Sequence, residues 1–177
     1  MAKSRYREIG DAILAEISSV PEAGRVHGHQ RWSADLGKYL DLFRWEAGGG
    51  LAQIRGWVLT RERAGEEAAS FGSNASGGFT PAGIGRRTHT FLLFGIMSAE
   101  DAAGSEAVFQ DLIEEICDRF RDEGTLRLLD ESGSPRVRSL ERLQPPQVDL
   151  IELRTFGNVL CHYAEIRLRA IERIRRD

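Results

Sequence analysis

The chain has 177 residues, of which 41% are hydrophobic and 29% are charged. This balance is typical of a folded globular protein and excludes general disorder, and the length fits one domain, residues 1–177, without an internal repeat. The formal net charge of −3 disfavours general nucleic-acid binding, because proteins that grip phosphate backbones usually carry a basic excess. The sequence shows neither a secretory signal nor an apolar run of about 20 residues, so we expect a soluble protein with no membrane partner.

The first part of the chain predicts two helices around a short strand. Residues 4–19 repeat apolar side chains at helical spacing, and Pro21 ends this helix. Residues 25–32 alternate well enough for a short strand. Ser33 is placed to cap a second helix, whose apolar stripe runs to Phe43.

Two longer strands are expected in the middle of the chain. They are Leu51–Arg63 and Thr88–Met97, and the second is apolar on both faces, which indicates a central strand. Between them, residues 64–87 are dominated by Gly, Ser and Ala and are too long for a simple hairpin loop. We expect a long irregular loop there, either mobile or ordered by a partner.

The last third of the chain predicts one long helix and two strands. Ser98, with an aspartate three residues later, resembles a capping box that opens a helix ending before Gly124. A second irregular loop is expected over residues 130–147, followed by strands at Val148–Thr155 and Asn158–Ile171. The element order predicts an α+β domain, with a mainly antiparallel sheet of about four to five strands and two or three helices packed on one face.

No motif in the sequence predicts catalysis. Residues 72–77 have the spacing of a phosphate-binding loop but lack the lysine and hydroxyl that must follow. His27 and His29 have a strand spacing that can hold a metal, and a solvated edge is the simpler interpretation. Cys161 and His162 are neighbours in a strand and point to opposite faces, so they cannot pair for catalysis, and we expect His162 to be a polar residue satisfied in the core. We therefore expect no enzyme, no cofactor and no resident metal; the alternative from another class is a small metal-dependent enzyme that uses His27 and His29.

A resemblance to a known family lies near the end of the chain. Arg154–Ala170 reads Arg-Thr-Phe-Gly-Asn-Val-Leu-Cys-His-Tyr-Ala-Glu-Ile-Arg-Leu-Arg-Ala, and it follows Pro-Gln-Val-Asp-Leu-Ile-Glu-Leu and the helix Val108–Arg121. Together these segments resemble the tail terminator proteins of long-tailed bacteriophages, in particular the tail-completion and neck proteins of transposable, Mu-like phages and prophages. The likeness covers the element order over most of the chain.

The resemblance implies a structural virion protein of the tail or neck, assembled in the host cytoplasm. Its copies would form a six-fold ring that ends growth of the tail tube and offers the joining surface for the head. The implied partners are further copies of the chain, the tail-tube protein and a head–tail connector or stopper protein. DNA would pass through the lumen without specific binding. Another neck component, a stopper or an adaptor, is the alternative within this class.

A ring of this kind needs two different patches on each subunit. The charged residues on one face of the last strand are the candidate subunit interface, with the polar face of the long helix as their complement. They are Glu165, Arg167 and Arg169. The segment 64–87 supplies the candidate contacts to the lumen or to a partner, which are Glu66, Glu67, Phe71 and Phe79.

Overall fold

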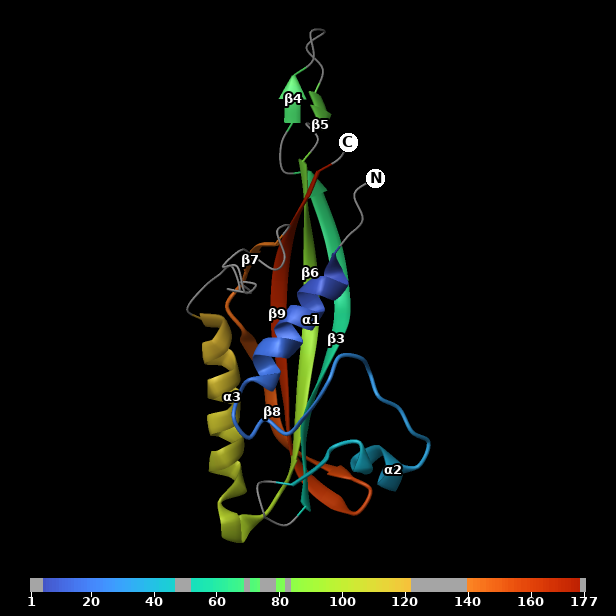
Figure 1. Ribbon diagram of the computed structural model, residues 1–177, viewed down its shortest axis with the longest axis vertical. Helices are drawn as coiled ribbons and strands as arrows, with labels where there is room; N and C mark the ends of the chain where they lie inside the picture. Colours follow the sequence, from blue (N-terminus) through green and yellow to red (C-terminus); the bar gives the residue numbers. More distant parts are fainter. Residues whose placement is uncertain are drawn as a thin grey trace.

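The computed structural model describes residues 5–46, 52–68, 71–73, 79–81, 84–121 and 140–175. These residues form a seven-stranded, mostly antiparallel sheet, a separate pair of short strands and three α-helices (Figure 1). The expected α+β class is confirmed, and the sheet has more strands than the four to five expected.

The elements follow one another with short connections in most of the described chain. In chain order they are α1 (Tyr6–Ser18), β1 (Arg25–His27), α2 (Leu36–Asp41), β2 (Arg44–Glu46), β3 (Ala52–Ala68), β4 (Phe71–Ser73), β5 (Phe79–Pro81), β6 (Ile84–Ser98), a 3₁₀ turn (Asp101–Ala103), α3 (Ser105–Arg121), β7 (Leu140–Leu143), β8 (Gln147–Phe156) and β9 (Val159–Arg175).

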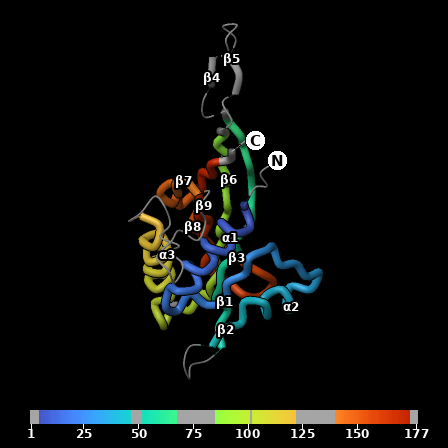
Figure 2. The backbone as a smooth tube through the Cα atoms, turned by 45° about the horizontal axis from the view of Figure 1, so that its top comes forward, coloured from blue at the N-terminus to red at the C-terminus, as the bar shows by residue number. Residues whose placement is uncertain are grey.

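Three long antiparallel strands, β3, β6 and β9, form the spine of the sheet. At one edge, β1 pairs in parallel and β2 antiparallel with the first residues of β3, beside α2 (Figure 2). At the other edge, β7 and β8 both pair with β9. The free ends of the long strands project past the helices, and the β4–β5 pair lies beyond them (Figure 1).

The main core lies between the sheet and the two longer helices, α1 and α3. Side chains alternate along each strand, so every second residue of β3, β6 and β9 faces these helices. The buried members of this cluster include Ile9, Ile13, Ile17, Trp57, Leu93, Phe109, Ile113, Ile116, Phe120, Ile166 and Leu168.

The short helix α2 covers the opposite face of the sheet. Its Leu40, followed by Phe43, packs on Val58, Ile96 and Tyr163, which alternate with the residues facing α1 and α3. The expectation of two or three helices on one face is met by α1 and α3, whereas α2 covers the other face, because the period of an amphipathic helix does not indicate which face of the sheet it covers.

The expected loop over residues 64–87 is wrong at both ends. β3 continues to Ala68 and pairs there with Gly85 of β6, and β4 and β5 form a further antiparallel pair. The sequence hides this extension because residues 61–67 are all exposed and show no alternation of apolar and polar side chains. The strands are held by their backbone ladder and by ion pairs such as Arg87–Glu66, at 2.7 Å.

The second expected loop, over residues 130–147, is also partly wrong. Its residues 140–143 form β7, and Gln147 begins β8. Residues 130–139 lie outside the described part of the chain.

The start of α3 differs from the expected capping box. Ser98 is the last residue of β6 and pairs with Cys161, so the helix begins instead at Ser105. Similarly, Asp35 rather than Ser33 caps α2, since its Oδ1 accepts a hydrogen bond from the Lys38 N–H at 3.0 Å.

Candidate assembly surface

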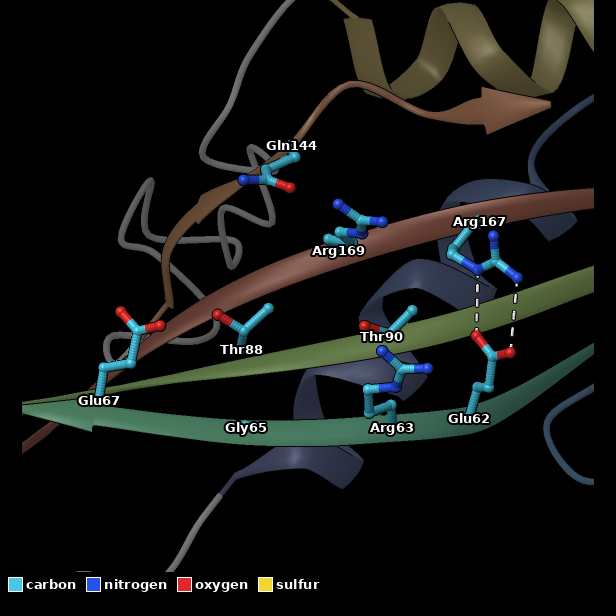
Figure 3. A pocket seen from close by; sticks show the side chains of 9 residues that line it. All are labelled: Glu62, Arg63, Gly65, Glu67, Thr88, Thr90, Gln144, Arg167 and Arg169. Atoms are coloured by element: carbon cyan, nitrogen blue, oxygen red, sulfur yellow. Dashed lines mark hydrogen bonds and ion pairs between the residues drawn. The ribbon is translucent and has the colours of Figure 1, made fainter. Parts of the chain in front are cut away.

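A polar groove of about 480 Å³ opens on the face of the sheet opposite α1 (Figure 3). Thr88 and Thr90 of β6 form its floor, because they alternate with residues that face the helices. β3 and β9 supply the charged side chains on either side. The lining residues are Glu62, Arg63, Gly65, Glu67, Thr88, Thr90, Gln144, Arg167 and Arg169.

Arg167 is held by two carboxylates at one end of the groove. Its Nε donates to Glu62 Oε2 at 3.0 Å (Figure 3), and its Nη1 forms an ion pair with Asp149 of β8. The hydrogen bond with Glu62 raises the pKa of this guanidinium. Arg167 thus ties β3, β9 and β8 together, and its charge is already neutralised within the chain.

Glu165 is also bound within the chain. The Tyr163 hydroxyl donates to Glu165 Oε1 at 2.6 Å, and the Arg154 guanidinium lies over the Tyr163 ring at 3.8 Å. Burial, followed by the bond to Glu165, raises the pKa of Tyr163. The structure therefore places the three candidate interface residues on one face of β9 but engages Glu165 and Arg167 in internal contacts.

Two arginines of the groove have no such partner among the described residues. Arg63 and Arg169 are exposed, and neither forms an ion pair with another described residue. Both are registered with Thr90, on opposite sides of β6. The sequence pointed to Arg169 and not to Arg63, because the expected strand Leu51–Arg63 ended at that residue and no pairing partner was predicted for it.

The four candidate lumen or partner residues do not lie in one loop. Glu66 and Glu67 belong to β3 and point to opposite faces, since Glu66 pairs with Arg87 while Glu67 lines the groove. Phe71 and Phe79 are the first residues of β4 and β5. Their side chains lie outside the described part of the structure.

The two histidines of the metal hypothesis have different surroundings. β1 ends at His27, so His29 is not part of the same strand. The His27 Nε2 lies 2.9 Å from the Leu42 carbonyl oxygen, and its ring packs edge-on against Phe43. His29 instead lines a groove beside α1. Among the described residues, no three His, Cys, Asp or Glu side chains are grouped as a metal site requires.

A serine–histidine contact lies at the start of α3. The Ser105 Oγ is 2.9 Å from His162 Nε2 and accepts a hydrogen bond from the Glu100 N–H at 2.7 Å. Both side chains are more than nine-tenths buried, and the Phe109 ring stacks on His162 at 5.6 Å. These contacts join the helix start to β9 and satisfy His162 in the core, as the sequence predicted.

The two cysteines are free and buried, one in α3 and one in β9. Burial raises the pKa of Cys117 and of Cys161 to about 11. Neither side chain is therefore a thiolate at neutral pH, which is the form that a nucleophile or metal ligand needs.

Comparison with known proteins gives no relative: no family model matches the chain, and no curated protein matches it. None of the described helices has both the length and the apolar character needed to cross a membrane.

Proposed function

We propose that this chain is a structural subunit that assembles with copies of itself into a ring. The observation that carries the proposal is the charged face of β3, β6 and β9 around the groove, which none of the described helices covers, together with the ends of these strands that project past the helices (Figures 1 and 3). A narrow polar ribbon that extends past its own core contributes little to the stability of a monomer, since sheets of few strands need packing to be stable. Such a ribbon gains the packing that it lacks when it contacts a neighbouring subunit.

The particular subunit that we propose is the tail terminator of a long-tailed phage or prophage. The resemblance of Arg154–Ala170 and the helix before it to that family supports this assignment, and these residues form most of α3, the end of β8 and most of β9. In this role, the ring would end growth of the tail tube and present a joining surface to the head. The chemistry of the described side chains suits a subunit that binds surfaces, because His27, His162 and both thiols are engaged in internal contacts or buried.

The experiment that tests this function is deletion of the gene from its parent genome, followed by electron microscopy of the lysate. We expect tails of uncontrolled length beside unattached, DNA-filled heads, and recovery of normal particles when the gene is supplied in trans. Tails of normal length that fail to join heads would indicate a stopper or adaptor instead. Joined particles with normal tails would reject the assignment to the neck.

A further inference from the structure

We propose that the groove of one copy binds the acidic face of α3 from the next copy. In this contact, Arg63 and Arg169 of one chain face Asp111 and Glu115 of its neighbour. The inference rests on the proposed ring-forming function and names the surfaces through which the ring closes.

The basic side of the contact is a pair of arginines on a rigid sheet. Arg63 and Arg169 are both registered with Thr90 of the strand between them, so their backbones lie two strand spacings apart, about 10 Å. Both side chains stand on the same face of the sheet in Figure 3. Each guanidinium offers five N–H donors in a planar fork that suits a carboxylate.

The acidic side of the contact is a pair of carboxylates on a rigid helix. Asp111 and Glu115 are exposed and stand one helical turn apart, with their Cβ atoms about 6 Å from each other. Neither forms an ion pair with another described residue, whereas Glu114 and Asp118 on the same helix both bind Arg121 at 2.7 Å. Long arginine side chains starting about 10 Å apart can converge on carboxylates at this spacing.

The surroundings of the two pairs complete the match. Beside the carboxylates, a cleft of about 300 Å³ includes the partly exposed, apolar Val108 and the Glu22–Arg55 ion pair, so this part of the surface is partly hydrophobic and its remaining negative charge comes from Asp111 and Glu115. Arg167 is paired with Glu62 and Asp149, and Glu67 also lines the groove, so its formal charges nearly cancel and its available positive charge is confined to Arg63 and Arg169. Two guanidinium groups suit two carboxylates and are too few for the phosphate backbone of DNA, which is gripped through several basic contacts.

The partner is a second copy because both surfaces are present on every chain and face opposite sides of the sheet. α3 packs on one face, and the groove opens on the other. In a two-fold dimer, the groove and the acidic face of α3 of each chain would both have to contact the same neighbour. The two surfaces lie on opposite faces of the sheet, so one neighbour can cover only one of them. Each added copy therefore leaves one groove or one helix face uncovered. Head-to-tail contacts of this kind close into a ring or continue as a filament.

The test uses two complementary double variants of the full chain. The groove variant carries Arg63→Glu and Arg169→Glu, and the helix variant carries Asp111→Arg and Glu115→Arg. Self-association is measured by sedimentation and native mass spectrometry in low salt, where exposed charges are least screened. All four positions are exposed, so both variants should keep the circular dichroism spectrum and the melting temperature of the wild type.

We expect each variant alone to associate on the order of 100-fold more weakly than the wild type, because like charges then meet at the contact. An equimolar mixture should assemble again with the two variants alternating, since each reversed surface then meets its opposite charge. Glu106→Arg is the matched control, because Glu106 is exposed on the same helix but points away from the Asp111 and Glu115 side.

Three outcomes would overturn the contact: a groove variant that assembles like the wild type, a mixture that does not recover, or a wild type that stays monomeric in low salt. None of these outcomes decides the proposed function, because the gene deletion tests the ring's role in the tail by tail length and head joining. Normal tails in the deletion would reject the function even if the purified chain assembled through this contact.

Discussion

Gly95 is the residue at which the structure predicts the sharpest response to a single methyl group. A Cβ at this position would lie 2.3 Å from Cζ3 of Trp57 and 2.5 Å from its Cε3. Trp57 is fully buried and stacks on Phe109, with ring centroids 5.8 Å apart, so the indole has no room to retreat. Overpacking of this kind costs about 1 to 3 kcal/mol, and a close contact with a fixed ring belongs at the upper end.

We expect Gly95→Ala to lower the free energy of unfolding by about 2 kcal/mol. This value sets an overpacking cost near 3 kcal/mol against the gain of about 1 kcal/mol that alanine brings by restricting the unfolded chain. The melting temperature should fall by about 4 to 8 °C for a domain of this size. The urea concentration at the midpoint of unfolding should fall, while the dependence of the free energy of unfolding on urea concentration stays unchanged. This combination shows that the native state is less stable but equally compact.

The matched control is Gly65→Ala, at a strand position where a Cβ would meet nothing within 4 Å. This variant should be as stable as the wild type or slightly more stable. Gly95→Ala should also be better tolerated in a Trp57→Leu background, since leucine lacks the ring atoms that the methyl group meets. A Gly95→Ala protein with the stability of the wild type would refute the packing described for Trp57.

Three further predictions concern the buried groups. His89 Nε2 lies 2.8 Å from Glu172 Oε2 inside the protein, so Glu172→Ala should remove this buried hydrogen bond and lower the free energy of unfolding in urea by about 3 kcal/mol; a loss below about 1 kcal/mol would contradict a buried contact between the two side chains. Cys117 and Cys161 have pKa values raised to about 11, above the ordinary 9, so the folded chain keeps protons that the unfolded chain loses. Stability should therefore fall as the pH rises from 9 to 11, and a thiol reagent at pH 8 should label either cysteine only after unfolding. Chelator should leave the melting temperature unchanged, because the His27 ring forms a hydrogen bond with the Leu42 carbonyl oxygen. A lower melting temperature after chelation would contradict the view that His27 holds no metal.

The sequence predicted secondary structure best where one face of an element packs on the core, because burial imposes a regular spacing of apolar residues. In β9, alternation placed Ile166 and Leu168 on one face and Arg167 and Arg169 on the other, and the structure confirms both faces. The helical period likewise located α1 and the buried side of α3. These patterns are readable because one face of each element is buried.

The sequence predicted the strand boundaries poorly where the strands do not pack on the core. Residues 64–68 and 84–87 extend β3 and β6 through backbone pairing and ion pairs such as Arg87–Glu66, and their Gly, Glu and Arg residues show no alternation of apolar and polar side chains. The ion pairs of Arg167 could not be predicted from the sequence either, because its partners Glu62 and Asp149 come from two other strands. A contact between distant strands depends on their register, which the sequence does not show.

The assembly of the purified chain into a ring is the central claim of this account, and native mass spectrometry tests it most directly. The measurement is made on the chain alone at low salt and again with isolated tail tubes. We expect a six-subunit species of about 119 kDa, six times the 19.8 kDa chain, and its binding to the end of the tube. A chain that stays monomeric alone and leaves the tubes unbound would contradict the claim.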